Sequence, residues 1–153
     1  MGMGAKMKRR DGFTLIEILA VVAIMSVVAI VATSLFYTGS NTYIKSEKSM
    51  EIKQNVRSAM EAITSDIKRT GDASKIYVKD ITRSGKTYKA LYVGDNVYYY
   101  DDSKKSICMN NNNGQELANE IDSFTFSIDG RKITVIITGT DGFTLNNVVF
   151  LPK

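Results

Sequence analysis

Residues 9–36 read RRDGFTLIEILAVVAIMSVVAIVATSLF, and this stretch decides how the chain is organised. From Phe13 to Phe36 there is no proline or glycine, and Glu17 is the only charged residue. At about 1.5 Å per residue, a helix of this length reaches roughly 36 Å, enough to cross a hydrocarbon core of about 30 Å. In lipid only a helix satisfies its own backbone, so we expect a membrane-spanning helix despite the many β-branched residues.

A basic tail precedes this helix and sets its expected orientation. The tail contributes most of the net charge of +4, because its four cations are offset only by Asp11. Basic residues favour the cytoplasmic side, so we expect the N-terminus inside and the C-terminal part outside. Since the remainder is almost neutral, no nucleic-acid contact is predicted. The tail cations are Lys6, Lys8, Arg9 and Arg10.

Glu17 is the costly feature of the apolar run, because a carboxylate in lipid needs a partner. A secretory signal peptide cut near Ala29–Ala32 and a permanent signal anchor both leave Glu17 unexplained. A cut directly after Gly12 would keep the helix and create an α-amino group on Phe13. That amine lies four residues before Glu17, on the same helix face. It can neutralise Glu17 within the chain or, where the dielectric is low, in a neighbouring subunit.

The sequence RRDG followed by FTLIEILAVVAIMSVVAI, within about Lys8 to Phe36, resembles the class III signal of type IV prepilins and of the pseudopilins of type II secretion and competence systems. The resemblance implies that a prepilin peptidase cuts after Gly12 and methylates the new N-terminal Phe13. It also implies that Glu17 is the assembly glutamate. Many pilins carry a proline midway along this helix, but the only proline here is Pro152. Partial melting of the helix in a filament is therefore not carried over to this chain.

This resemblance implies a structural subunit with no catalytic residues and no cofactor. The subunit would be a single-pass bacterial membrane protein that is later built into an extracellular, cell-surface pilus or pseudopilus. Its implied partners are other pilin or pseudopilin subunits, the prepilin peptidase, the inner-membrane assembly platform and membrane lipid. The alternative is a membrane-anchored extracytoplasmic binding domain that never assembles.

Beyond Phe36 the sequence predicts an amphipathic helical part. Thr38–Asn41 is expected to interrupt the helix or to cap a second one. Apolar residues then recur every three or four positions, and Gly71 is the predicted stop. Packing on the protein's own sheet is favoured over a coiled coil, because the pattern lasts only about two heptads. The apolar stripe consists of Ile52, Val56, Met60, Ile63 and Ile67.

From Ala73 onward short apolar runs alternate with turn residues, which predicts an antiparallel sheet of about five to seven strands. Tight hairpins are expected at Gly94–Asn96, Asp129–Gly130 and Asp141–Gly142. The expected fold class is α+β, a long N-terminal helix packed on that sheet, and it resembles the build of pilins. The predicted divisions are a cytoplasmic leader (1–12), a transmembrane assembly helix (13–36), an amphipathic helix (37–71) and a β domain (72–153).

The remaining features add no catalytic or metal site. Without histidine and with the single cysteine Cys108, zinc sites of the Cys/His type and Ser-His or Cys-His catalysis are excluded. The runs RSAMEAITSDIKRTG and ELANEIDSFTFSIDGRKITVIITG resemble J-type pseudopilins or PilW-like minor subunits, which implies a minor component; F-type competence pseudopilins have a similar layout. Tyr98–Tyr100 alternates between sheet faces, and we expect half-buried aromatics, with an interface patch as the alternative.

Overall fold

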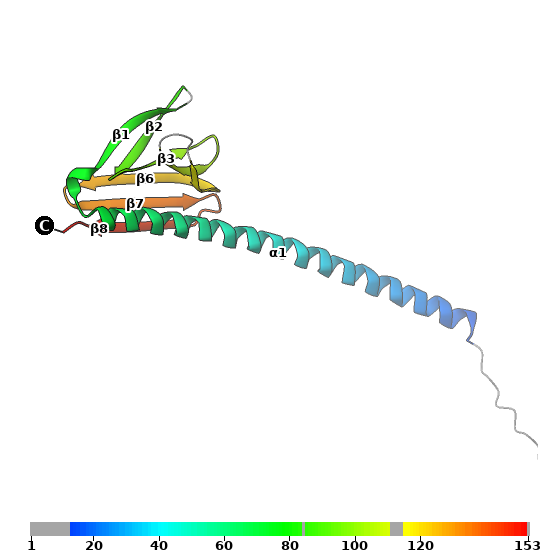
Figure 1. Ribbon diagram of the computed structural model, residues 1–153. Coiled ribbons are helices and arrows are strands. Elements are labelled where there is room, and N and C mark those ends of the chain that lie inside the picture. Colours follow the sequence, from blue (N-terminus) through cyan, green and yellow to red (C-terminus); the bar gives the residue numbers. More distant parts are fainter. Residues whose placement is uncertain (1–12, 84, 111–114, 153) are drawn as a thin grey trace, which may run out of the picture. The chain divides into compact units, whose positions relative to one another are not determined.

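The computed structural model describes residues 13–83, 85–110 and 115–152 (Figure 1). The predicted leader, with Gly12 and the basic tail, lies outside the described residues. The chain divides into two compact units, which we call the N-terminal segment (up to Lys45) and the C-terminal domain (from Ser46). In chain order the elements are α1 (Leu15–Thr70), η1 (Ala73–Lys75), β1 (Ile76–Arg83), β2 (Lys86–Val93), β3 (Asn96–Asp101), β4 (Ser106–Met109), β5 (Gln115–Ala118), β6 (Ile121–Asp129), β7 (Lys132–Gly139) and β8 (Thr144–Phe150).

The helix α1 is continuous where the sequence predicted a break. All four residues of Thr38–Asn41 are helical, so the expected interruption is wrong. This stretch has one glycine and no proline, and its hydroxyl groups bond within the helix. Thr38 Oγ1 donates to Ser34 O at 3.0 Å, and Thr42 Oγ1 donates to Thr38 O at 2.9 Å. Polar side chains that are satisfied in this way do not compete for the backbone as they would in a turn.

At its C-terminal end α1 stops as predicted. Gly71 has a φ of 61°, and its N–H donates to Ile67 O at 3.2 Å. A residue in this left-handed conformation ends a helix by turning the chain away, and glycine adopts it without steric cost. One turn earlier, the carboxylate of Asp66 attaches the helix to β3 by accepting hydrogen bonds from Tyr98 Oη and Asn96 Nδ2. Within the helix it also accepts one from Arg69 Nη2.

The apolar stripe of α1 within the C-terminal domain packs against the sheets, which confirms that interpretation over a coiled coil. All five predicted residues are at most 5% exposed and belong to one core cluster with side chains from both sheets. Ala59 and Thr64 complete the buried face of the helix. Thr64 is accommodated there because its hydroxyl donates to Met60 O at 2.7 Å.

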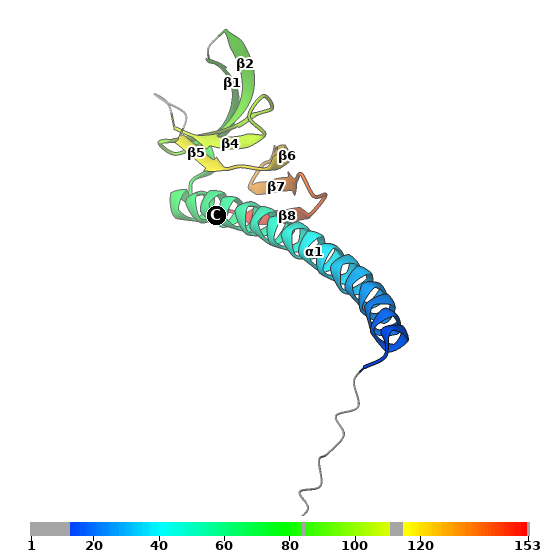
Figure 2. The same ribbon diagram turned by 90° about the vertical axis from the view of Figure 1, so that its right-hand side faces the viewer.

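The β part is larger than predicted and is divided into two sheets. The described strands form a five-stranded sheet in the order β1-β2-β3-β4-β5 and a three-stranded sheet in the order β6-β7-β8, with every pairing antiparallel. Figures 1 and 2 together label these strands. The single sheet of five to seven strands is therefore wrong. β4 and β5 are only four residues long, and β5 (QELA) carries little strand signal. After β5, Glu120 adopts a φ of 55° and the pairing of β6 shifts register at Ile121, so the chain leaves the first sheet.

The three predicted hairpins are confirmed. Gly94 and Asp95 connect β2 to β3, and Asp141–Gly142 lies between β7 and β8. Asp129 ends β6, and Gly130 with Arg131 connects it to β7. The α+β class is confirmed with them. The β1–β2 hairpin curves strongly (Figure 2).

Tyrosines on β3 belong to two different clusters, one on each face of the five-stranded sheet. Tyr98 is fully buried in the cluster that includes the α1 stripe. Tyr99 is 6% exposed and packs on the opposite face with Cys108, which is 2% exposed. The alternation between faces is thus confirmed, and Tyr98 and Tyr99 are core residues. Cys108 is a core residue of this second cluster as well.

Polar contacts attach the first turns of α1 in the C-terminal domain to the loops around β6 and β7. Lys48 Nζ lies 3.4 Å from Glu120 Oε1, and Thr140 Oγ1 donates to Glu120 Oε2 at 2.8 Å. The hydrogen bond from Thr140, with that from Lys48, lowers the pKa of Glu120. Asp141 similarly accepts hydrogen bonds from the Phe143 N–H at 3.0 Å and from Ser49 Oγ at 2.9 Å. Both bonds lower the pKa of Asp141, the bond from Phe143 more than the bond from Ser49.

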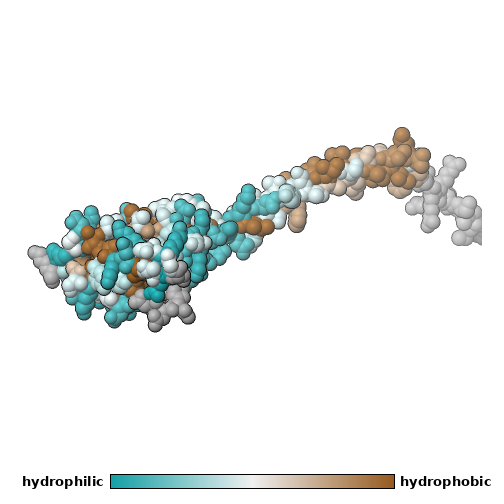
Figure 3. Space-filling view, turned by 90° about the horizontal axis from the view of Figure 1, so that it is seen from above, coloured by the Kyte–Doolittle hydropathy of each residue, from teal (hydrophilic) through white to brown (hydrophobic). Residues whose placement is uncertain are grey.

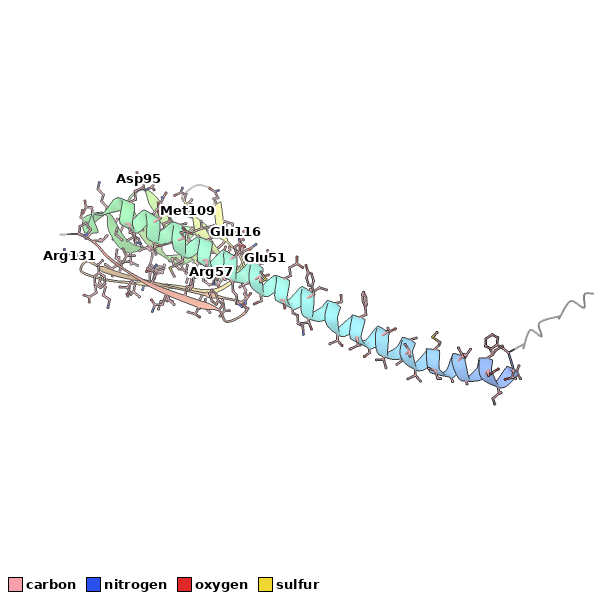
Figure 4. The ribbon with its side chains drawn as sticks, turned by 90° about the horizontal axis from the view of Figure 1, so that it is seen from below. Glu51, Arg57, Asp95, Met109, Glu116 and Arg131 are labelled. Atoms are coloured by element: carbon pink, nitrogen blue, oxygen red, sulfur yellow. The ribbon has the colours of Figure 1, made fainter. Side chains whose placement is uncertain are left out.

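Phe143, just before β8, lies beneath basic side chains of α1. The guanidinium carbon of Arg57, which is labelled on the helix in Figure 4, is 5.7 Å from the centre of the Phe143 ring. Lys53 Nζ is 5.9 Å from the same ring centre. Both distances are within the range of cation–π attraction, which favours this placement of the basic groups over the aromatic face.

Candidate assembly site at the start of the helix

Thr14 is the residue that starts α1. Its carbonyl oxygen accepts the first intrahelical hydrogen bond, from Ile18 N at 3.3 Å, while Thr14 itself lies before the first helical residue. This makes Thr14 the N-cap and places Glu17 at the third helical position. A helix start leaves several backbone N–H groups without partners, so the side chains at these two positions decide how they are satisfied.

Thr14 and Glu17 satisfy each other in a reciprocal capping box. Glu17 Oε2 accepts from the Thr14 N–H at 2.8 Å and from Thr14 Oγ1 at 2.9 Å. In return, the Glu17 N–H lies 3.4 Å from Thr14 Oγ1. A capping box places a negative side chain in the first turn, where the helix dipole stabilises it. Both contacts to the carboxylate involve Oε2, and Oε1 accepts no hydrogen bond from the described residues.

The surroundings of this box are apolar and exposed. In the N-terminal segment, large apolar side chains from Phe13 to Ile44 are between 53% and 84% exposed on all sides of the helix. Figure 3 shows one face of this surface, which is mostly brown toward the start of the helix. The most apolar 18-residue window of α1 has a mean hydropathy of 2.9, and none of it is buried. By length and composition, α1 is able to cross a membrane. Such a surface is costly in water and requires lipid or other helices around it.

Two of the hydroxyl groups in this apolar stretch bond to the backbone of the helix. Ser26 Oγ donates to Ala23 O at 2.7 Å, and Thr33 Oγ1 donates to Ala29 O at 2.8 Å. Bonds of this kind remove most of the cost of placing a hydroxyl in hydrocarbon. Glu17 is the one charged group in the described part of the N-terminal segment before Lys45. Its Oε1 atom accepts no hydrogen bond from the described residues, so the carboxylate can still accept one.

Of the predicted site residues, Phe13 and Glu17 lie among the described residues. Phe13 is 84% exposed, and Glu17 lies one turn along the same helix start. Gly12, Lys6, Lys8, Arg9 and Arg10 lie outside the described residues. The sequence interpretation missed Thr14, although its signal was readable: a threonine followed three residues later by glutamate, directly before an apolar run, is the pattern of a capping box.

The described ranges offer no metal centre as an alternative to this assembly site. There, no group of three or more histidine, cysteine, aspartate or glutamate side chains is arranged to hold a metal ion. Charged pairs such as Lys86 with Asp102 and Lys105 with Asp122 are exposed single pairs on the surface of the C-terminal domain. Exposed pairs of this kind contribute little to stability and do not form a catalytic set.

Comparison with known families identifies the start of the chain. Residues 7–33 match the family described as the prokaryotic N-terminal methylation motif, which is the class III signal and includes Gly12, Phe13, Thr14 and Glu17. Neither a curated protein nor a solved structure matches the chain. The motif is consistent with a type IV pilin or pseudopilin, and one long helix with antiparallel sheets is a pilin-like arrangement.

Proposed function

We propose that the chain is the precursor of a structural subunit of a type IV pilus or of a related pseudopilus, and that it is a minor component. A prepilin peptidase cuts it after Gly12 and methylates Phe13. The helix first holds the subunit in the membrane, with the N-terminus in the cytoplasm and the C-terminal domain outside. It then packs among the helices of neighbouring subunits in a cell-surface filament.

One observation carries this proposal: a methylation motif lies on a helix whose only charged group in its membrane-length apolar part is Glu17, four residues after the motif's Phe13. An anchor alone gives no reason for a carboxylate there, because a charge in the apolar interior is unfavourable without a partner. An amine on Phe13 supplies that partner. Because the amine exists only after cleavage, processing and assembly are linked.

The capping box gives the Glu17 carboxylate hydrogen-bond partners before the subunit is assembled. Before assembly, the Thr14 N–H and hydroxyl neutralise part of the cost of holding the carboxylate near the membrane. In a filament, the unused oxygen of Glu17 can bind the amine of a neighbouring Phe13, where the low dielectric strengthens their attraction. A charge that is satisfied only at one register between subunits favours that register.

The role we propose is structural and not enzymatic. Support comes from the chain's composition, which has no histidine and one cysteine, and from the burial of that cysteine in the C-terminal domain. The expected partners are other pilin or pseudopilin subunits, the prepilin peptidase, the inner-membrane assembly platform and membrane lipid. No cofactor is needed for this role.

Mass spectrometry of the membrane-extracted protein tests the processing step. In cells that contain a prepilin peptidase, the mature chain should begin at Phe13 with one methyl group on its amine. Replacing Gly12 by a bulky residue should leave the leader attached and give the larger precursor on a gel. An intact N-terminus on the unaltered chain would instead support the anchored, non-assembling alternative.

Two variants at the capping box separate its two roles. Glu17→Gln keeps the geometry of the box, because glutamine also caps at this position, but removes the charge. We expect this variant to be inserted and cleaved normally and to be depleted from sheared filaments. The matched control, Thr14→Val, removes the capping hydroxyl and keeps the charge, and it should enter filaments close to the level of the unaltered chain. If Glu17→Gln entered filaments at the level of Thr14→Val and of the unaltered chain, charge pairing by Glu17 would not be needed for assembly.

A further inference from the structure

A groove in the C-terminal domain lies between the start of β2 and β6, and we call it the β2–β6 groove. Its cavity of about 370 Å³ is within the size range of ligand pockets. The lining residues are 86–89 of β2, Tyr100 and Asp102 at the end of β3, and 124–126 of β6. The groove therefore has one strand on each side.

One wall of the groove is a strand edge that β3 leaves open. All eight residues of β2 pair with β1, but only Ala90–Val93 pair with β3. Val93 and Asn96 flank the two-residue turn between β2 and β3, so odd-numbered residues of β2 bond toward β3. Thr87 lies beyond the end of that pairing, so its backbone N–H and C=O point into the groove. Figure 1 shows this end of the β1–β2 hairpin projecting away from β3.

The opposite wall is the outer edge of β6. Asp129 and Lys132 flank the turn between β6 and β7, so odd-numbered residues of β6 bond toward β7. Phe124 and Phe126 therefore direct their backbone N–H and C=O groups away from β7, toward the groove. Their ring centres are 5.0 Å apart, and both rings are at least half-buried. The groove thus combines backbone donors and acceptors with an aromatic lining.

This combination fits an extended peptide segment. A strand edge is satisfied by the backbone of another strand, which carries N–H and C=O groups at the same spacing. Side chains of an added strand alternate between the two faces, so every second one can cover the aromatic rings. A small apolar molecule would cover the rings but would leave the backbone groups of both walls without partners.

Charges along β2 indicate which segment fits. Lys86 forms an ion pair with Asp102 and lies 5.6 Å from the centre of the Tyr88 ring, so its charge is already compensated. Lys89 is exposed, and among the described residues no ion pair links it to Asp80, its neighbour across β1. A lysine at an open edge discourages pairing with basic strands. A carboxylate beside Lys89 and an apolar residue beside Tyr88 would complement the edge.

We propose that the β2–β6 groove binds an extended, acidic segment of a partner protein, which adds as a strand to the open part of β2. The backbone of the segment bonds to Thr87, one of its carboxylates lies beside Lys89, and an apolar side chain packs beside Tyr88. The added strand continues the line that β3 leaves when it ends at Asp101. This binding requires neither cleavage after Gly12 nor assembly of a filament, so its test is separate from that of the proposed function.

A nuclear magnetic resonance titration of the isotope-labelled, full-length chain in detergent tests the proposal. The probe is the peptide SEVTVS, blocked at both ends, whose acid, valine and threonine can face Lys89, Tyr88 and Thr87 in turn. We expect saturable shifts of the amide signals of these three residues. The peptide SKVTVS, with lysine in place of the acid, should bind about fivefold more weakly. N-methylation of the acid and of the threonine removes two backbone donors and should weaken binding at least about tenfold.

Variants of the chain provide matched controls. Lys89→Glu should reverse the preference between the two peptides, whereas Lys79→Glu, at an exposed lysine of β1, should leave it unchanged. Thr87→Pro removes the N–H that points into the groove and should weaken binding of SEVTVS at least about fivefold. Thr82→Pro, at the residue facing Thr87 on β1, removes an N–H at the other edge of the hairpin and should not. The amide spectra of the free variants show that they are folded.

Three results would overturn the proposal. The first is the absence of saturable shifts at the groove. The second is equal binding of SEVTVS and its N-methylated form, which would mean that the groove takes apolar side chains and not a strand. The third is an unchanged charge preference in Lys89→Glu, or an equal loss of binding in the two proline variants.

Discussion

Gly139→Ala probes how closely α1 approaches β7 in the C-terminal domain. Gly139 ends β7, and a Cβ atom built there would lie 2.5 Å from Ile52 Cγ2 and 3.2 Å from Val56 Cγ2 on the helix. Carbon atoms in good contact are about 3.5–4.0 Å apart, so the closer methyl group is roughly 1 Å too near. Because Ile52 and Val56 are themselves buried, the strand or the helix must move to admit the added atom.

The expected loss of stability follows from two opposing effects. Overpacking of a core costs about 1–3 kcal/mol. Replacing glycine by alanine also restricts the unfolded chain, which returns about 0.4–1 kcal/mol. At the middle of these ranges the net destabilisation should be about 1.3 kcal/mol, equivalent to a fall in Tm of roughly 5–10 °C for a domain of this size. Gly39→Ala is the matched control, because no atom beyond its chain neighbours and its own helix backbone lies within 4 Å of its Cβ position, so the domain should be unaffected.

A double-mutant cycle with Ile52→Ala locates the clash. Ile52→Ala removes the Cγ2 atom and should alone cost about 2–5 kcal/mol. If the clash is with that atom, the double variant should be more stable than the sum of the single effects by about 1 kcal/mol or more. The measurement is urea unfolding of the full chain in detergent, followed by the near-ultraviolet signal of the tyrosines. Additive effects, or a Gly139→Ala variant as stable as the unaltered chain, would refute the close approach of helix and strand.

Three further predictions concern charged and titratable groups in the C-terminal domain. Asp66→Asn should cost about 1–3 kcal/mol in urea unfolding, because it weakens the hydrogen bonds from Tyr98, Asn96 and Arg69 to a nearly buried carboxylate. Burial, and secondly the hydrogen bond to Asp66, raise the pKa of Tyr98. Above about pH 10 only the unfolded chain loses this proton, so the free energy of unfolding should fall as the pH rises. Tyr98→Phe should make that fall with pH less steep. The lowered pKa values of Glu120 and Asp141 predict the opposite trend in acid. Stability should be complete above about pH 5 and should fall as the pH drops through their folded values, less steeply in the variant Glu120→Gln with Asp141→Asn.

Much of the fold could be predicted because its signals are local. The apolar stripe from Ile52 to Ile67 indicated a helix with one buried face, and Gly71 indicated its end. Paired turn residues such as Asp129–Gly130 indicated hairpins because few other residues adopt the required backbone angles. The break at Thr38–Asn41 was predicted wrongly for a physical reason: hydroxyl groups that favour turns in water can equally bond to the helix backbone, as they do here.

Features that depend on distant partners could not be predicted in this way. The division into two sheets depends on Glu120 at a φ of 55° and on a shift in pairing at Ile121, and neither residue type signals such a change. The network around Asp66 joins residues about thirty positions apart, so no spacing rule reveals it. At the helix start, by contrast, the capping box of Thr14 and Glu17 spans only three residues and was open to prediction.

The sequence by itself determined the N-terminal part of this protein: the methylation motif, the membrane-length helix and the isolated carboxylate of Glu17 all follow from residues that are close together in the chain. Helix formation, capping and transfer into lipid depend on a residue and its near neighbours, so a local reading is sufficient for them. Only the tertiary structure decided how the strands divide, which tyrosines are buried and that the start of β2 is left with an open edge. Strand pairing joins residues that are distant in sequence, and an edge is defined by the strand that is missing beside it.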